Sequence, residues 1–377
     1  MTREKIQMVD LSAQYEKVQK EMDQAILDVV RSTQFINGQA VKSFTSVLSD
    51  YLNKAYVVPC ANGTDALQIA LMALDLEQGD EVIVPAFTYV ATAEVIALLG
   101  LKPIMVDVDP LTFNTTADLI KPKLTDRTKA IIPVHLFGQS TDMEDILLLA
   151  KEGGIAVIED NAQAIGAQYT FRNGSKDFTG CMGDMGTTSF FPSKNLGCYG
   201  DGGAMTTRDH GFALKMQMIA NHGQSKKYHH QVIGCNSRLD TIQAAVLEIK
   251  LKHLDSYSAA RQSVAKYYDT HLADIEGLIT PTVAKNSTHV YHQYTLRVLN
   301  GKRNDLKAFL ADHGVPSMIY YPLPLYKQVA FQSILESDYD LPVSEQLSHE
   351  VLSLPIHTEM EKETQDFIIE TVKKFSF

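Results

Sequence analysis

The nine residues IAVIEDNAQ, Ile155–Gln163, join an apolar run to two carboxylates and two amides. An uninterrupted apolar run of this length is typical of a strand buried on both faces. Asp160 ends the run, so its carboxylate is expected to be partly buried and to need a donor or a cation as partner. Gln163 lies three residues farther on, and a turn can bring both side chains onto one ligand. This stretch alone is equally consistent with an aspartate that only caps a turn.

Apolar runs of the same kind recur on both sides of this stretch, with helical patterns between them. They predict buried strands at Glu81–Pro85, Pro103–Asp107, Ala130–Val134, Ile155–Asp160 and Thr187–Phe191. Apolar residues recur at helical spacing from Leu67 to Leu74 and from Met143 to Ala150, the latter after a predicted capping box at Thr141–Glu144. Such alternation predicts an α/β fold with a mostly parallel sheet covered by helices on both faces.

The pattern changes after about residue 255. Here we expect helices at Ser256–Leu272, Asp305–His313 and Glu363–Lys374, and strands at His289–Val298 and Ser317–Tyr321. A linking helix, apolar on one face, is expected to begin near Ser237. The sequence therefore predicts a large domain at 1–250 and a smaller α+β domain at 251–377.

The composition of the 377 residues is that of a globular protein, with 45% hydrophobic residues and a net charge of −11. The acidic balance argues against a surface that binds nucleic acid or anionic membranes. The N-terminus lacks the apolar core of a signal peptide, and no apolar run approaches the roughly 20 residues of a membrane helix. The cysteines and histidines lack the spacing of a disulfide framework or a metal site. We expect a cytoplasmic enzyme or binding protein.

Two further segments carry residues that suit a ligand. Asn62-Gly63-Thr64-Asp65 leads into a predicted helix, where free N–H groups can bind an anion or, more plainly, where Asn62 only caps the helix. Lys194 follows the predicted strand Thr187–Phe191. Burial there would lower the pKa of its amine toward neutrality and suit it to Schiff-base chemistry. The alternative is an exposed loop lysine.

Taken together, these groups match the needs of pyridoxal phosphate. The carboxylate of Asp160 keeps the pyridine nitrogen protonated, Lys194 forms the Schiff base, and the helix N-terminus takes the phosphate. Tyr89, after the strand Glu81–Pro85, offers an aromatic face to the ring.

Six stretches resemble the nucleotide-sugar aminotransferases, the DegT-like family of fold-type I pyridoxal phosphate enzymes. They are ANGTDAL (61–67), FTYVATAE (87–94), VIEDNAQAIGA (157–167), SFFPSKNLGCYGDGGA (189–204), GCNSRLDTIQAA (234–245) and YYPLPLYKQ (320–328). The resemblance runs from about residue 8 to 375. It implies a large cofactor domain with a mostly parallel, seven-stranded type of sheet.

The resemblance also implies roles for single residues. Lys194 would be the Schiff-base lysine and proton carrier, Asp160 the partner of the pyridine nitrogen and Gln163 the neighbour of the ring hydroxyl. The residues implied at the phosphate are Gly63, Thr64, Asp65 through its backbone, Ser189 and, from the partner subunit of a homodimer, Asn236. The residues implied at the substrate are Arg238, Tyr320 and Tyr321, although a buried aromatic strand explains the two tyrosines nearly as well.

The implied reaction moves an amino group, expected from L-glutamate, to a keto-sugar of a nucleotide diphosphate, with pyridoxamine phosphate formed on the way. The resemblance is strongest to enzymes that aminate C3 of UDP-2-acetamido-2-deoxy-3-oxo-glucuronate for lipopolysaccharide (O-antigen) biosynthesis. It rests on the stretches SFFPSKNLGCYGDGG and YYPLPLYKQ. The runner-up is C3 or C4 amination of a dTDP- or UDP-linked 6-deoxy keto-sugar. A regulator on the same fold that binds without turnover is the rival from another class.

Overall fold

The computed structural model describes residues 5–335 and 339–377. The α-helices are α1 (Leu11–Ser32), α2 (Gln39–Tyr51), α3 (Gly63–Met72), α4 (Ala91–Leu98), α5 (Ala117–Ile120), α6 (Met143–Gly153), α7 (His210–Ala220), α8 (Thr241–Leu251), α9 (Leu254–Leu272), α10 (Arg303–Asp312), α11 (Pro342–Glu350) and α12 (Lys362–Lys373). Short 3-10 turns lie at Lys121–Lys123, Leu136–Gly138, Leu325–Lys327 and Val329–Phe331. Within the described part of the chain, none of the helices has the length and apolarity that crossing a membrane requires.

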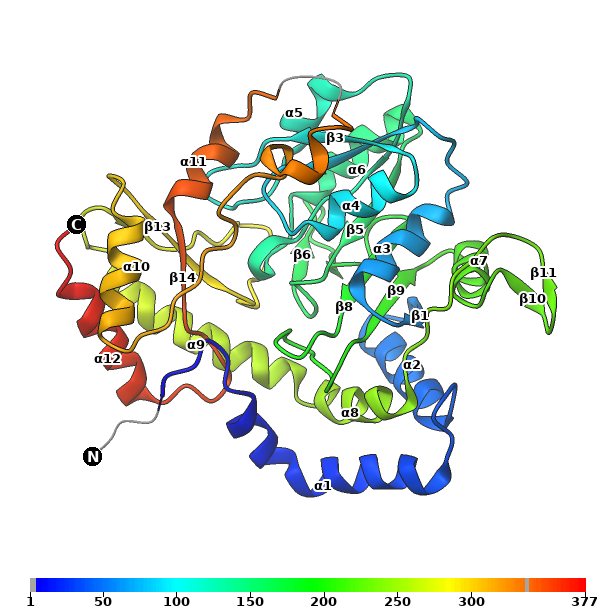
Figure 1. Ribbon diagram of the computed structural model, residues 1–377, viewed down its shortest axis with the longest axis horizontal. Coiled ribbons are helices and arrows are strands. Elements are labelled where there is room, and N and C mark those ends of the chain that lie inside the picture. Colours follow the sequence, from blue (N-terminus) through cyan, green and yellow to red (C-terminus); the bar gives the residue numbers. More distant parts are fainter. Residues whose placement is uncertain (1–4, 336–338) are drawn as a thin grey trace.

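A seven-stranded sheet forms the centre of the molecule (Figure 1), in the order β1-β9-β8-β5-β4-β2-β3. Its strands are β1 (Tyr56–Cys60), β2 (Glu81–Pro85), β3 (Lys102–Val106), β4 (Thr128–Ile131), β5 (Ala156–Asp160), β8 (Met185–Ser189) and β9 (Gly203–Thr207). The pairs from β8 to β3 are parallel, while β9 is antiparallel to both of its neighbours. The expected α/β fold is confirmed, and the five predicted strands lie within three residues of their predicted ends.

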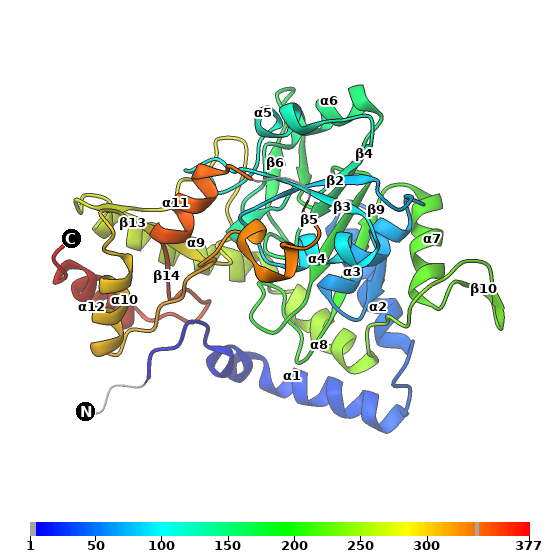
Figure 2. The ribbon, with the colours of Figure 1, turned by 45° about the horizontal axis from the view of Figure 1, so that its top comes forward.

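Helices cover both faces of this sheet, as Figure 2 shows. Side chains of α3, α4 and α7 pack with one face in a core that includes Leu67, Val84 and Met216. On the other face, Ile146 of α6 packs with Ile131 and Val157. Both faces of the central strands are therefore out of water, which explains why their sequences are apolar without alternation.

The C-terminal part has a smaller sheet of its own, β12-β13-β14, from β12 (Leu278–Ile279), β13 (Tyr294–Val298) and β14 (Val351–Leu354). Helices α9, α10 and α12 pack with it around a separate apolar core. Two small hairpins complete the fold: β6 (Gln168–Thr170) with β7 (Lys176–Phe178), and β10 (Gln224–Lys226) with β11 (His229–His230). This second core favours the division near residue 250, which stays a prediction.

Two predicted strands are wrong in part. Only Tyr294–Val298 of the run from His289 is a strand, because the guanidinium of Arg261 donates to the carbonyls of Tyr291 and His292 and holds the preceding residues out of the sheet. The run Ser317–Tyr321 forms only a single bridge at Met318.

The predicted capping box at Thr141–Glu144 is also wrong, and so is the predicted start of the linking helix. The N-cap position of α6 is Asp142 with no side-chain cap bond, and the hydroxyl of Thr141 donates to the carbonyl of Val134 instead. The hydroxyl of Ser237 donates to Asp65, and the helix expected from Ser237 begins at Thr241 instead. In each case the hydroxyl bonds to a residue outside the predicted helix.

Candidate active site

A cavity of about 680 Å³ opens at the carboxyl ends of β2, β5 and β8. This is the edge at which ligands bind in open α/β sheets. Nine of the residues expected from the sequence line it: Gly63, Thr64, Tyr89, Asp160, Gln163, Ser189, Lys194, Tyr320 and Tyr321. Residues more than 250 positions apart in the chain thus meet at one site.

Asp160 ends β5 and is only 5% exposed. One carboxylate oxygen accepts a hydrogen bond of 2.7 Å from the hydroxyl of Thr92 on α4, and the other accepts from the backbone N–H of Ala162 at 3.1 Å. These two bonds supply the donors that the sequence led us to expect. They also fix the carboxylate at the cavity wall.

Gln163 is held at both ends of its amide. Its Oε1 accepts from the backbone N–H of Phe137 at 2.8 Å, and its Nε2 donates to the hydroxyl of Tyr321 at 3.1 Å. The turn after β5 therefore brings Asp160 and Gln163 into the same cavity.

Lys194 lies in the turn after β8, with its backbone N–H bonded to the carbonyl of Phe191. Burial lowers the pKa of its amine to about 8, although the nearby carboxylate of Asp160 raises it. This confirms the expected direction. About half of the amine is then the free base at pH 8, and this is the form that acts as a nucleophile or accepts a proton.

The N-terminus of α3 forms another wall of the cavity. The side chain of Asn62 caps the helix by accepting from the N–H of Asp65 at 2.8 Å. The backbone runs so close to Ser189 that a Cβ on Gly63 would lie 2.7 Å from the Cβ of Ser189. The first N–H groups of a helix lack intrahelical acceptors and attract anions, so Gly63 and Thr64 line an anion-binding wall.

Asp65 does not line this cavity, and its carboxylate is engaged elsewhere. Its Oδ2 accepts a hydrogen bond of 2.6 Å from the hydroxyl of Ser237. The negative charge that would repel an anion is thus directed toward a donor outside the cavity lining.

Aromatic rings form the mouth of the cavity. The rings of Tyr89 and Tyr321 lie 6.3 Å apart, centroid to centroid, and those of Tyr320 and Tyr321 lie 6.0 Å apart. Tyr89 is 57% exposed, so one of its faces is open to a ligand. Tyr320 and Tyr321 are only half-buried and line the cavity, which argues against a buried aromatic strand.

Two residues of the site carry no distinguishing signal in the sequence. Thr92 is the buried donor to Asp160, but a threonine in an apolar helix is unremarkable. His292 lines the cavity, and its Nδ1 is buried with no hydrogen-bond partner among the described residues. Burial and the nearby cations of Lys194 and Arg261 hold the pKa of His292 well below its usual range, so the ring is neutral.

Asn236 and Arg238 are not brought to this cavity. Asn236 is exposed and pairs with Asn221, while Arg238 lines a separate cavity of about 710 Å³ between α2, β1 and α7. Within one chain these two residues are therefore separated from Lys194.

Comparison with known proteins gives consistent matches over nearly the whole chain. The model of the DegT/DnrJ/EryC1/StrS aminotransferase family matches residues 16–373. The chain is 46% identical over 352 residues to the UDP-2-acetamido-2-deoxy-3-oxo-D-glucuronate aminotransferase of Pseudomonas aeruginosa, covering 93% of this chain and 95% of that protein. It is 44% identical over 375 residues to the pleiotropic regulatory protein of Geobacillus stearothermophilus, covering 98% of each.

A solved structure gives a similar result. The crystal structure of ntda from Bacillus subtilis with bound cofactor PMP superimposes with a TM-score of 0.89 at 31% sequence identity. The match covers 99% of this chain and 86% of that one.

Proposed function

This chain belongs to the DegT/DnrJ/EryC1/StrS aminotransferase family, and from that premise we propose that it transfers an amino group from L-glutamate to C3 of UDP-2-acetamido-2-deoxy-3-oxo-glucuronate. It is a pyridoxal phosphate-dependent aminotransferase. The observation that carries the sugar is the 46% identity to the enzyme of that name, over 93% of this chain. We assign the product to the biosynthesis of lipopolysaccharide O-antigen.

The residues of the cavity fit pyridoxal phosphate at three separate points. The N-terminus of α3, with the close approach of Gly63 to Ser189, suits the phosphate. The amine of Lys194 has a lowered pKa and suits the aldehyde, while the buried carboxylate of Asp160 suits the ring nitrogen. When bound, the cofactor supplies an electron sink for the carbanion left by the departing proton of the amino donor.

Each side chain then has a physical task. Lys194 carries the proton between the amino donor's Cα and the cofactor, and its pKa of about 8 lets it both accept and release a proton near neutral pH. Asp160, oriented by Thr92, keeps the ring nitrogen protonated. Gln163 and Tyr89 hold the ring, and Tyr320 and Tyr321 face the sugar.

The two phosphates of a nucleotide diphosphate sugar need cationic partners. Among the described residues that line the cavity of one chain, Lys194 is the only lysine or arginine. We place the missing positive charge on a second copy of this chain, in a homodimer with shared sites. Arg238 and Asn236 lie outside their own cavity. The β10–β11 hairpin, which protrudes from the molecule in Figure 1, presents Lys226 and Lys227 exposed.

Exposed apolar side chains support a second copy as the partner. Phe35, Ile36 and Tyr56 are each about half exposed, and Ile233 is 87% exposed. Large apolar side chains left in water are typical of a surface that another chain covers.

We assign the protein to the cytoplasm because its four cysteines are free thiols.

Subunit mixing tests the shared site. Lys194→Ala and Asn236→Ala homodimers are each expected to be inactive or nearly so. A mixed population should regain up to about a quarter of the wild-type activity, because half of the dimers are mixed at equilibrium and each has one site with both groups intact. Activity is measured after subunit exchange is verified by mass. No recovery in proven heterodimers would contradict the shared site.

A substrate assay tests the reaction itself. The purified protein, loaded with pyridoxal phosphate, is incubated with L-glutamate and the UDP-linked 3-oxo-glucuronate, and 2-oxoglutarate and the amino sugar are measured. Preference for a dTDP- or UDP-linked 6-deoxy keto-sugar would assign the runner-up substrate. Cofactor binding without turnover of any keto-sugar would favour a regulator, the class that the name of the Geobacillus relative suggests.

A further inference from the structure

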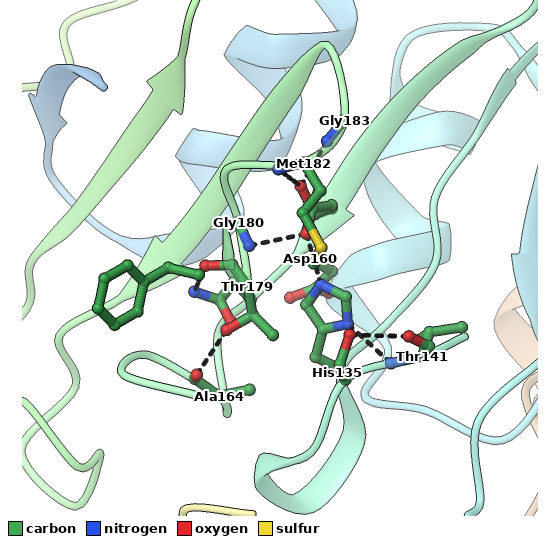
Figure 3. Close-up of polar contacts among 12 residues, drawn as sticks. His135, Thr141, Asp160, Ala164, Thr179, Gly180, Met182 and Gly183 are labelled. Carbon is green, nitrogen blue, oxygen red and sulfur yellow. Dashed lines mark hydrogen bonds and ion pairs between the residues drawn. The ribbon is translucent and has the colours of Figure 1, made fainter. Parts of the chain in front are cut away.

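A buried hydrogen-bond network lies beside Asp160 at the end of β5, where Figure 3 shows His135, Gly180, Met182 and Gly183 close together. Glu159, the preceding residue of β5, is 0% exposed. Successive side chains of a strand point to opposite faces, so Glu159 points into the protein where Asp160 points to the cavity. A carboxylate that is completely buried needs several donors to remain stable.

Glu159 has four such donors. Its Oε1 accepts from the backbone N–H groups of Met182 and Gly183, both at 2.6 Å. Its Oε2 accepts from the N–H of Gly180 at 2.8 Å and lies 2.8 Å from Nε2 of His135. Because only N–H groups face the two oxygens, the carboxylate is ionised and acts only as an acceptor.

The state of His135 follows from its other ring nitrogen. Its Nδ1 accepts a hydrogen bond of 3.1 Å from the backbone N–H of Thr141, so the ring's proton is on Nε2 and is donated to Glu159. His135 is therefore a neutral donor, and the network holds one net negative charge inside the protein.

The two segments that donate hydrogen bonds to Glu159, at His135 and at 180–183, each continue to residues of the cavity. The chain from His135 continues to Phe137, whose N–H holds Gln163, and the N–H of His135 itself donates to the carbonyl of Asp160 at 3.0 Å. The segment 180–183 runs into β8, which ends at Ser189 five residues before Lys194. One side chain thus joins the backbone segments that carry Asp160, Gln163 and Lys194.

We propose that Glu159, through His135 and the segment 180–183, is a positioning residue that sets the alignment of Asp160 and Lys194 on the cofactor. This inference rests on the proposed function, because it assumes that these two residues hold pyridoxal phosphate. Glu159 touches neither the cavity nor the reacting groups. It acts by fixing three neighbouring backbone segments at the edge of the sheet.

The test compares holoenzymes reconstituted with pyridoxal phosphate. Glu159→Gln keeps the size of the side chain but turns an NH₂ group toward donors. The dissociation constant of the cofactor should rise by between about tenfold and a hundredfold, the effect of leaving a buried polar group unpaired. The pH midpoint of the cofactor's visible band should also move, because Asp160 and Lys194 are displaced. The matched control is Asp184→Asn, which removes a carboxylate of the same segment that binds the start of β5 at Val157.

A second pair of variants decides the matter if Glu159→Gln does not fold. The new side chain in His135→Gln can donate to Glu159 and accept from Thr141 as the imidazole does, whereas the ring in His135→Phe fills the space without either bond. His135→Gln should therefore keep the wild-type cofactor affinity and pH midpoint. His135→Phe should bind the cofactor more weakly and show a shifted pH midpoint.

Two results would overturn the inference. One is a Glu159→Gln enzyme that melts at a lower temperature but keeps the wild-type cofactor affinity and pH midpoint, which is a purely structural effect. The other is equal behaviour of His135→Phe and His135→Gln. A wild-type chain that takes up no pyridoxal phosphate would instead overturn the proposed function together with this inference, and the wild-type titration alone reveals it.

Discussion

Glu159 and Asp160 are neighbours in the chain, but their surroundings differ completely. Every hydrogen-bonding position that Glu159 offers to the interior faces a donor, four in all. Asp160 has two side-chain bonds and an open side toward the cavity. The carboxylate of Asp160 keeps hydrogen-bonding positions open to a ligand in the cavity. The carboxylate of Glu159 has all its positions occupied by protein donors, which holds the backbone around it in place.

The same contrast extends to the lysines. Burial lowers the pKa of both Lys194 and Lys250 to about 8. Lys250, on α8, is only 2% exposed and has its amine 4.6 Å from the ring centre of Tyr199, whereas Lys194 lines the cavity. A lowered pKa is therefore not the mark of the site, since access to the cavity is also required.

The largest effect should come from the cavity lysine. Lys194→Ala is expected to lower kcat by about a thousandfold or more, because it removes the group that carries the proton. Lys250→Met, which replaces a buried stem with one of similar length, should leave kcat close to the wild-type value. Both are measured as 2-oxoglutarate formed per second. An equal loss of kcat in the two variants would contradict the distinction between the cavity lysine and the buried lysine.

The next effect should come from the phosphate wall. Gly63→Ala places a Cβ 2.7 Å from that of Ser189, so the two segments must separate. The dissociation constant of pyridoxal phosphate should rise by about tenfold, in line with the cost of overpacking. Gly153→Ala, at the exposed end of α6, is the control for a Gly-to-Ala change. Unchanged affinity in Gly63→Ala would show that the phosphate binds elsewhere.

A smaller effect is expected at Thr92. Thr92→Val keeps the shape but removes the buried hydroxyl that orients Asp160, so kcat/KM should fall by about three- to tenfold, the net value of one typical hydrogen bond. Thr371→Val removes a buried hydroxyl of α12 far from the cavity and controls for the loss of stability. A steady-state assay in which both variants match the wild type would contradict the role of Thr92.

The sequence predicts the strand ends well because apolar runs and the residues after them are local features. Asp160, Gln163 and Lys194 could therefore be expected at one edge before their contacts were known. The shapes of 289–293 and 317–321 could not, because they depend on distant partners such as Arg261. The same holds for Thr141 and Ser237, whose hydroxyls bond to residues outside the helices predicted to begin there. Glu159 did leave a signal, as a charged residue inside a strand that is otherwise apolar up to Asp160.

The most direct test of the account is where pyridoxal phosphate attaches. The cofactor-free chain is mixed with pyridoxal phosphate, reduced with borohydride at a series of pH values, and the modified peptide is identified by mass spectrometry. We predict modification of Lys194, with an initial rate that rises as the pH passes through about 8, because the deprotonated amine is the nucleophile. Attachment to Lys250 or to any other lysine in place of Lys194 would contradict the account.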